Sequence, residues 1–308
     1  MNNIKNYYSF FLINVFAIII GGCKNVDNSL INDGVKTINI NGVTREFILY
    51  IPSSYNSTDT VPLMLNFHGW TMSASDQMNL SDMRALAESE KFILVYPQGT
   101  KFRNRFYGST HWNVGSWTTG STSDDIGFVD KLIDHMSVNY NIDLERIYAC
   151  GYSNGGFFSH ELACNLSNKI AAIGAVSANM STRTKVNCNP SHPIPVITVS
   201  GTNDNEVSYD GTNFEGQISH NDVLNYWINY NQTDTFPIIS DMPNINSTDG
   251  STVKLHQYKN GNNNVEIVHY KVINGEHDWP GTLGNMDIDA NSIIWRFVSQ
   301  FDINGRIE

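Results

Sequence analysis

Residues 147–156 read IYACGYSNGG and combine a strand-forming run with a glycine-rich turn. The run 147–150 is typical of a buried β-strand, and the residues after Asn154 favour a helix. The pattern Gly-x-Ser-x-Gly between a strand and a helix exposes its serine, here Ser153, on a sharp turn at the end of the strand. The alternatives are a glycine-rich phosphate loop and a helix start that contains a serine. The segment therefore predicts a nucleophilic serine at a sheet edge.

A serine nucleophile needs a base to take its proton, and the base needs an orienting carboxylate. The chain order Ser153, Asp204, His277 is the order found in α/β-hydrolases. Asp204 follows the predicted strand 196–200, and His277 follows the last predicted strand, so both are expected at the edge that carries Ser153. Asp204 would fix the imidazole tautomer and His277 would take the serine proton. A surface-loop role for His277 is the alternative, and three other acids could supply the carboxylate: Glu206, Asp210 and Asp278.

Two backbone N–H groups are expected to stabilise the oxyanion that such a reaction forms. One belongs to Asn154, and the other to Trp70, because His68-Gly69-Trp70 follows a buried strand at 61–67. His68 is expected to hold this loop rather than to act as a base. The acidic residues at 287–289 begin like a calcium loop but lack its glycine and distal glutamate, so neither a metal site nor a cofactor is predicted.

Strand and helix patterns alternate along most of the chain. Strands are predicted at 35–51 (two of them), 61–67, 92–96, 147–152, 171–177, 196–200, 252–258 and 265–273. Helices are predicted at 75–91, 124–140, 154–166, 221–230 and 288–301. This alternation predicts an α/β fold, with a mostly parallel central sheet covered by helices on both faces.

The composition limits the possible partners. The 308 residues include 30 Asp and Glu against 19 Lys and Arg, a net charge of −11, and the hydrophobic fraction is 41%. The negative field would repel nucleic acid, which is excluded as a partner. The hydrophobic fraction is that of a chain with a real core, which excludes disorder.

The N-terminus predicts export. Lys5 precedes an apolar run at 10–20 that is short for a membrane span, and Gly21-Gly22-Cys23 follows. Residues 1–22 are therefore expected to be a signal peptide, 23–34 a lipidated N-terminus and linker, and 35–308 the catalytic domain. Lipidation of Cys23 would be the only membrane attachment, and the protein would be anchored to the bacterial cell envelope. The alternatives are secretion after ordinary cleavage and an uncleaved anchor.

Three more cysteines lie in the predicted domain. Cys150 lies within a strand, whereas Cys164 and Cys188 lie in a predicted helix end and a loop, so the latter two form the better disulfide pair. Three unpaired thiols are the alternative.

Aromatic residues stand out in the long segment 98–123, where a structureless loop favours a functional role. Its tryptophans are candidates to line the substrate site, together with one in the predicted oxyanion loop and one two residues after His277. The four are Trp112, Trp117, Trp70 and Trp279. The alternative for the segment is packing over a sheet edge.

With these motifs the chain resembles the esterase/poly(3-hydroxybutyrate) depolymerase family, which includes feruloyl and acetylxylan esterases. The resemblance covers about residues 36–301 and is carried by His68-Gly69, the segments 124–128 and 146–148, and the residues around Asp204 and His277. It implies the same triad and a disulfide between Cys164 and Cys188. The chain departs from the family at two positions. Trp70 is bulky where the family often has a small residue or a cysteine, and Ser200 stands where many members have histidine.

These observations predict an extracellular serine carboxylic-ester hydrolase that removes feruloyl or acetyl groups from plant polysaccharide or oligosaccharide side chains. Cleavage of polyhydroxybutyrate, another polyester or an oligoester is the alternative reaction. A peptidase is less well supported, because no propeller domain is recognised in the sequence. The alternative outside the enzymes is a carbohydrate-binding surface lipoprotein on a hydrolase scaffold.

Overall fold

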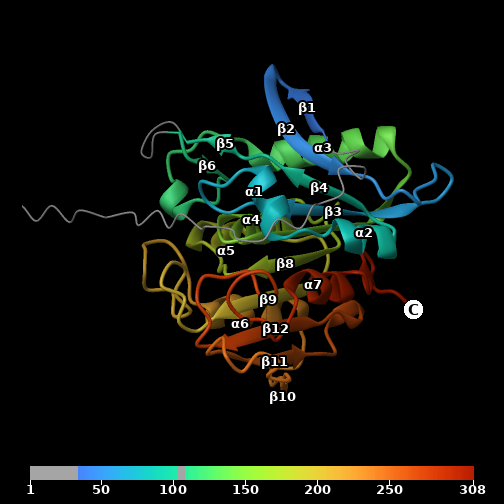
Figure 1. The fold of residues 1–308 in the computed structure, drawn as a ribbon. Helices are drawn as coiled ribbons and strands as arrows, with labels where there is room; N and C mark the ends of the chain where they lie inside the picture. The colour runs from blue at the N-terminus through green and yellow to red at the C-terminus, as the bar shows by residue number, and fades with distance from the viewer. Residues whose placement is uncertain (1–33, 103–107) are drawn as a thin grey trace, which may run out of the picture. The chain divides into compact units, whose positions relative to one another are not determined.

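The computed structural model describes residues 34–102 and 108–308 (Figure 1). The predicted signal peptide, the lipidation site Cys23 and most of the predicted linker lie outside the described residues. From residue 34 onward the described chain packs as one unit. No helix in this part of the chain has the length and apolar character needed to cross a bilayer.

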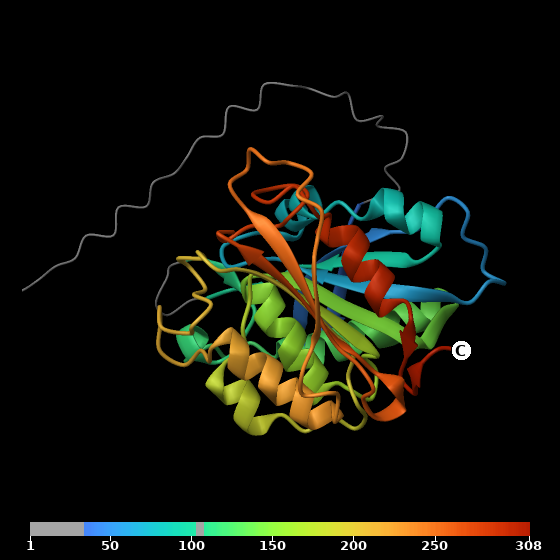
Figure 2. The same ribbon diagram turned by 90° about the horizontal axis from the view of Figure 1, so that it is seen from below.

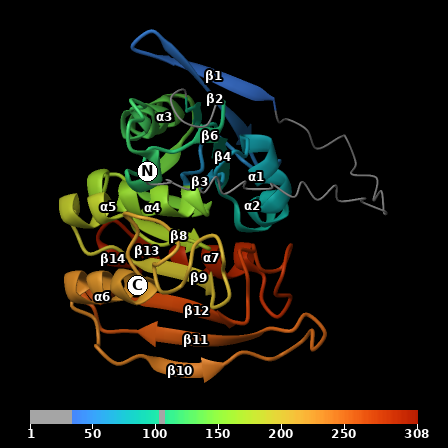
Figure 3. The ribbon, with the colours of Figure 1, turned by 90° about the vertical axis from the view of Figure 1, so that its left-hand side faces the viewer.

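A ten-stranded sheet forms the centre of the fold, in the order β1-β2-β4-β3-β7-β8-β9-β12-β11-β10 (Figure 3). Its strands are β1 (Val35–Ile40), β2 (Val43–Tyr50), β3 (Val61–Phe67), β4 (Ile93–Pro97), β7 (Ile142–Tyr152), β8 (Ala172–Val176), β9 (Val196–Gly201), β10 (Ile238–Asp241), β11 (Thr252–Tyr258) and β12 (Ile267–Ile273). Neighbouring strands from β4 to β12 are parallel, and the outer pairs are antiparallel.

Helices cover both faces of this sheet (Figure 2). One face packs against α3 (Asp125–Asn139), α4 (Asn154–Asn165) and α6 (His220–Asn231), which bury side chains such as Leu132, Phe158 and Trp227. The other face packs against α1 (Ala74–Leu80), α2 (Arg84–Glu90) and α7 (Ala290–Val298), with Trp295 stacked on Phe92. The predicted α/β architecture, mostly parallel and covered on both faces, is confirmed.

Several short elements complete the described chain. They are the helix α5 (Thr182–Asn187), the 3-10 turns η2 (Ser116–Thr118) and η3 (Asn262–Asn264), and the small hairpins β5 (Thr100–Lys101) with β6 (Thr110–His111) and β13 (Phe301–Asp302) with β14 (Gly305–Arg306).

The predicted helix 75–91 is wrong in one respect, because the structure divides it into α1 and α2. The hydroxyl of Tyr96 donates to the carbonyl of Ser81 and accepts from the N–H of Met83. This side chain from β4 therefore supplies hydrogen bonds at the break, and a contact so distant in sequence is invisible to local periodicity.

The disulfide prediction is confirmed. Cys164 at the end of α4 is bonded to Cys188 just after α5, and Cys150 in β7 is a buried free thiol. The bond closes a loop of 24 residues, which contributes roughly 3 kcal/mol in the chain-entropy model. It ties the α5 segment to the helix that begins beside Ser153.

Candidate active site

Ser153 lies at the junction of β7 and α4, as the sequence predicts. Its backbone has φ 52° and ψ −119°, a conformation that is costly for a residue with a side chain. The N–H of Ser153 donates to the carbonyl of Val176 at the end of β8, 2.9 Å away, which holds the turn against the sheet. The serine is partly exposed at the carboxyl ends of the parallel strands.

The glycines around Ser153 allow close backbone contacts. A Cβ on Gly151 would lie 2.4 Å from the carbonyl carbon of Gly155, and a Cβ on Gly155 would lie 2.1 Å from the carbonyl oxygen of Phe67. Both distances are too short for any side chain. The glycines thus let α4 begin directly against the end of β3, next to the loop that carries Trp70.

Asp204 and His277 are brought into direct contact by the loops that follow β9 and β12. The Asp204 Oδ2 atom lies 2.7 Å from His277 Nδ1. The Oδ1 atom accepts the N–H groups of Glu206 and Val207 at 2.9 and 2.7 Å. Asp204 is 4% exposed, and hydrogen bonds to both of its carboxylate oxygens hold the group in place. With Nδ1–H donating to the carboxylate, the Nε2 atom of His277 is left to accept a proton.

The residue before the serine places His277 beside the turn. The Tyr152 hydroxyl donates to the backbone carbonyl of His277 at 2.7 Å, and the two rings lie 5.0 Å apart. Burial raises the pKa of Tyr152, so the phenol stays neutral and can donate this bond. In the described part of the chain, Ser153 Oγ makes no hydrogen bond to His277 Nε2. Such contacts are often long in unliganded sites and tighten when substrate binds.

The three rival carboxylates fit the orienting role less well. Glu206 Oε2 is 4.0 Å from Nε2 of His277, the wrong nitrogen, and its side chain is 77% exposed. Asp210 is exposed, and hydrogen bonds from Thr212 and Ser208 lower the pKa of its carboxyl. Burial raises the pKa of Asp278, which is not hydrogen-bonded to the imidazole among the described residues. Asp204 alone of the four bonds to Nδ1.

The side chain of Asn154 fastens the 98–123 segment to the turn. Its Oδ1 atom accepts the N–H of Trp112 at 2.7 Å, and its Nδ2 atom donates to the carbonyl of Trp112 at 3.1 Å. The indole N–H of Trp112 in turn donates to the carbonyl of His68 at 3.0 Å. The loop after β3 and the start of α4 are therefore held together through one buried tryptophan. These are the two segments whose backbone N–H groups were predicted to bind the oxyanion.

His68 acts within this loop as a neutral hydrogen-bonding group. Its Nε2 atom accepts the N–H of Gly99 at 2.9 Å, and its Nδ1 atom lies 2.8 Å from the carbonyl of Gly69. Burial lowers the pKa of His68 to about 4. This supports the expectation that His68 is structural rather than a base.

The predicted substrate-lining tryptophans separate into two groups. Trp112 and Trp279 are wrong as predictions in this conformation, because both side chains are 0% exposed. Trp112 stacks on Phe158 at 4.9 Å, and the indole of Trp279 donates to Asn291. Packing in the core explains them fully.

Trp70 and Trp117 are partly exposed and remain candidates to contact substrate. Trp70 packs edge-on against Phe102 and His111, within the 98–123 segment. Trp117 packs against Phe157 of α4 and Phe214, with ring centroids 4.8 and 4.7 Å apart. Phe214 lies in the loop after Asp204, and sequence reasoning did not single it out.

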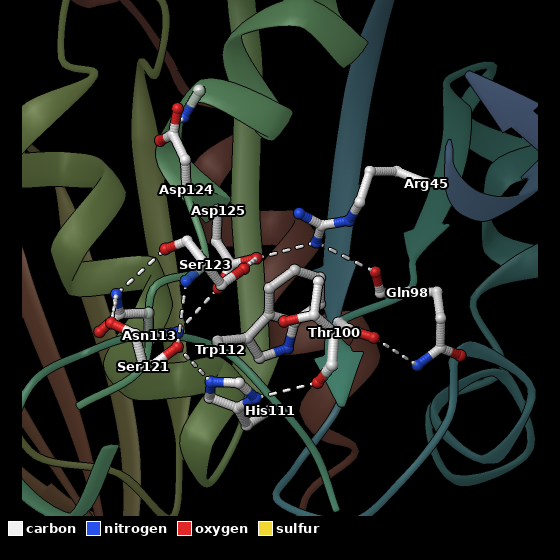
Figure 4. Close-up of polar contacts among 12 residues, drawn as sticks. Arg45, Gln98, Thr100, His111, Trp112, Asn113, Ser121, Ser123, Asp124 and Asp125 are labelled. Carbon is white, nitrogen blue, oxygen red and sulfur yellow. Dashed lines mark hydrogen bonds and ion pairs between the residues drawn. The ribbon is translucent and has the colours of Figure 1, made fainter. Parts of the chain in front are cut away.

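A buried ion pair is hydrogen-bonded to the 98–123 segment (Figure 4). Arg45 in β2 donates to Asp125 Oδ1 at 2.8 Å, and its guanidinium lies 3.9 Å from the centre of the Phe128 ring. The other Asp125 oxygen accepts the N–H of Asn113 at 2.9 Å. Asn113 is the neighbour of Trp112, so the ion pair fixes the backbone that Asn154 holds. In the sequence, Asp125 is recognisable only as part of an acidic pair at a helix start. That pattern does not indicate that Arg45 is its partner.

We predict that Asp125→Asn lowers the free energy of unfolding by about 3 kcal/mol, because it leaves the buried Arg45 charge without a partner. Asp82→Asn is the matched control: the Asp82–Arg84 pair is also 2.8 Å long, but its side chains are 46% and 21% exposed. Exposed pairs contribute about 0–1 kcal/mol. Urea unfolding of both variants measures the difference, and equal losses would contradict the structural role of Asp125.

An open polar groove lies beside this segment. It has a volume of about 430 Å³, and hydroxyl, amide and charged groups make up most of its lining. The lining residues are Asn113, Ser121, Thr122, Ser123, Asp124, Asp125, Ile126, Glu161 and Arg183. Several of them are labelled in Figure 4.

Comparison with known proteins shows that part of the chain is similar to a family of esterases. Residues 45–188, which include Ser153 and the 98–123 segment, match the family model described as esterase PHB depolymerase. The resemblance that the sequence motifs predicted is thereby confirmed over these residues.

Curated relatives agree with this assignment. A bifunctional acetylxylan esterase/xylanase of Neocallimastix patriciarum is 30% identical over 280 residues, which are 88% of this chain and 36% of that protein. Feruloyl esterase B of Piromyces equi is 31% identical over 169 residues, covering 54% of this chain and 30% of the relative. The chain thus spans about a third of the length of these two relatives.

Solved structures show the fold. An acetyl xylan esterase from Aspergillus awamori superimposes with a TM-score of 0.59 at 12% identity, covering 86% of this chain and 99% of that one. A ferulic acid esterase from Anaeromyces mucronatus gives a TM-score of 0.51 at 15% identity, covering 87% and 90%. The fold is that of the α/β-hydrolases, as predicted.

Proposed function

We propose that the chain is a serine carboxylic-ester hydrolase that removes feruloyl or acetyl groups from polysaccharide or oligosaccharide side chains. The observation that carries the proposal is the contact between Asp204 and His277 beside the strained turn of Ser153. The match of the segment that contains Ser153 to the esterase PHB depolymerase model supports the same reaction class.

The proposed reaction has two halves. His277 Nε2 takes the proton of Ser153 Oγ as that oxygen attacks the ester carbonyl, and Asp204 stabilises the imidazolium that forms. Backbone N–H groups of Trp70 and Asn154 would stabilise the oxyanion. His277 then protonates the departing alcohol, which leaves an acyl group on Ser153. Water, deprotonated by His277, attacks this acyl-enzyme. The bond to Ser153 Oγ then breaks, His277 returns the proton to that oxygen, and the acid is released.

Two features support an acylated carbohydrate as the substrate. The polar groove beside the 98–123 segment offers hydroxyl, amide and carboxylate groups, which suit a hydroxyl-rich ligand. The partly exposed rings of Trp70 and Trp117 provide apolar surfaces on which a sugar or a feruloyl ring could stack. The named activities of the two curated relatives, acetylxylan esterase and feruloyl esterase, are of this kind.

Export from the cytoplasm is part of the proposal. A disulfide persists in an oxidising compartment, and the Cys164–Cys188 bond supports that location. Lipidation of Cys23, with attachment to the cell envelope, stays a prediction from the sequence.

A substrate screen tests the proposal. The purified protein is assayed with methyl ferulate, acetylated xylan and hydroxybutyrate oligomers, with Ser153→Ala as the blank. We expect release of ferulate or acetate well above that blank. Preferential cleavage of the hydroxybutyrate oligomers would favour the polyester alternative. Failure to hydrolyse any of the three, or p-nitrophenyl acetate, would overturn the esterase assignment.

A further inference from the structure

Two buried histidines lie outside the proposed triad and have no role in the steps above. His220 opens α6 and His269 lies in β12, and both are 0% exposed. Their ring centroids are 4.3 Å apart. Figure 3 shows the helix α6 beside the strands β9 and β12. Buried polar groups must be hydrogen-bonded to be tolerated, so their partners indicate what the pair does.

The hydrogen bonds of this pair begin and end on the loop that carries Asp204. The Tyr209 hydroxyl lies 2.9 Å from His269 Nε2, and His269 Nδ1 lies 3.2 Å from His220 Nε2. His220 Nδ1 lies 3.0 Å from Asn179 Oδ1, and the Asn179 amide donates to the carbonyl of Ser208 at 3.0 Å. Ser208 and Tyr209 are neighbours in sequence, four and five residues after Asp204.

The carbonyl of Ser208 sets the direction of each hydrogen bond in this series, which runs from Asn179 through the two histidines to Tyr209. Because Asn179 must donate to that carbonyl, its Oδ1 atom faces His220 and accepts from Nδ1–H. His220 Nε2 is then an acceptor, His269 Nδ1 is a donor, and His269 Nε2 accepts from Tyr209. The Thr198 hydroxyl, 2.9 Å from His269 Nδ1 and 3.2 Å from His220 Nε2, can bridge the two rings without changing either tautomer.

Both imidazoles are held neutral by their surroundings. Burial lowers the pKa of His220 to about 3 and lowers the pKa of His269 well below its usual value. His256 of β11 lies beside His269, and Lys271 of β12 lies over the Tyr209 ring, so the neighbouring basic groups also oppose protonation. An added proton would place two donors face to face.

We propose that His220 and His269 are positioning residues for Asp204, because their hydrogen bonds clamp residues 208 and 209 to the sheet and so fix the loop that presents the triad carboxylate. The inference rests on the proposed esterase function. A second bond supports it: the N–H of His220 donates to the carbonyl of Tyr209 at 2.9 Å. The loop is therefore fastened through both the backbone and the side chain of Tyr209.

Tyr209→Phe tests the clamp by removing one hydroxyl. We expect kcat to fall about tenfold, as for loss of one positioning hydrogen bond, with KM changed less than twofold. Tyr230→Phe is the matched control, since the Tyr230 hydroxyl is also partly buried and donates to a backbone carbonyl, that of Pro190. This control should keep the kcat of the unmodified protein. Equal kcat values for both variants would overturn the inference.

The same change in an Asp204→Asn background separates positioning from a general structural role. If the clamp acts through Asp204, Tyr209→Phe should cause no further loss of kcat there. The same tenfold loss in both backgrounds would overturn the inference. An inactive unmodified protein would instead reject the proposed function.

Nitrogen-15 NMR of the histidine rings gives a readout that does not need activity. Both His220 and His269 should be neutral Nδ1–H tautomers at pH 7 and remain so at pH 5. An Nε2–H tautomer or a doubly protonated ring at either position would overturn the inference.

Discussion

Ser153→Ala is expected to lower kcat for p-nitrophenyl acetate by on the order of 10⁶-fold, because no acyl-enzyme can form without the hydroxyl. Alanine keeps the Cβ atom, so the strained backbone at φ 52° is no worse accommodated than in the native chain. The thermal midpoint should therefore stay within a few degrees. Circular dichroism on heating measures the fold, and release of nitrophenolate measures the activity.

Ser159→Ala is the matched control for this prediction. Ser159 is buried in the same helix, and its hydroxyl donates to the carbonyl of Gly155, one turn earlier. Its loss should leave kcat near the native value. Substantial turnover by Ser153→Ala in a folded protein would mean that another residue is the nucleophile.

Asp204→Asn is expected to lower kcat by on the order of 10⁴-fold while the protein stays folded. The Oδ1 atom can continue to accept the N–H groups of Glu206 and Val207, so the loop is retained. The amide, however, removes the negative charge that stabilises the imidazolium. If its NH₂ group faces His277, it also selects the tautomer in which Nε2 carries the proton and cannot accept one.

Asp210→Asn provides the comparison, because this exposed aspartate lies in the same loop and bonds mainly to Thr212. We expect it to retain the native kcat. The kinetic constants of the two variants are measured side by side with one ester. A larger loss of kcat for Asp210→Asn than for Asp204→Asn would show that Asp204 is not the carboxylate that orients His277.

The sequence was sufficient for the features that depend on local pattern and chain order. The strand ending at Tyr152 and the helix beginning at Asn154 both lie where the glycine-rich pattern predicts them. Asp204 and His277 could be paired in advance because parallel strands end at one edge, and the residues after such strands meet there.

Features that depend on distant contacts could not be predicted in this way. The break at Ser81 requires the hydroxyl of Tyr96, and Arg45 finds its partner Asp125 eighty residues later. No strand was predicted at the position of β10, whose residues show no alternation in sequence and are all exposed in the structure. Pairing with β11 makes it a strand.

The tryptophans show a different limit. Trp112 and Trp117 occupy the same segment and have similar neighbours in sequence, yet one is fully buried and the other is partly exposed. The difference arises because Asn154 holds the backbone of Trp112 against α4. Composition identifies an aromatic segment but cannot tell which ring faces solvent.

Trapping the acyl-enzyme tests the central claim most directly. The protein is mixed briefly with p-nitrophenyl acetate, quenched in acid, digested and analysed by mass spectrometry. Acetylation of Ser153 is expected on its peptide, with a larger fraction acetylated at early times than at late times, and no such label in Ser153→Ala. Rapid ester hydrolysis with no acetyl group on Ser153 at any time, or with the label on another residue that turns over, would contradict the account.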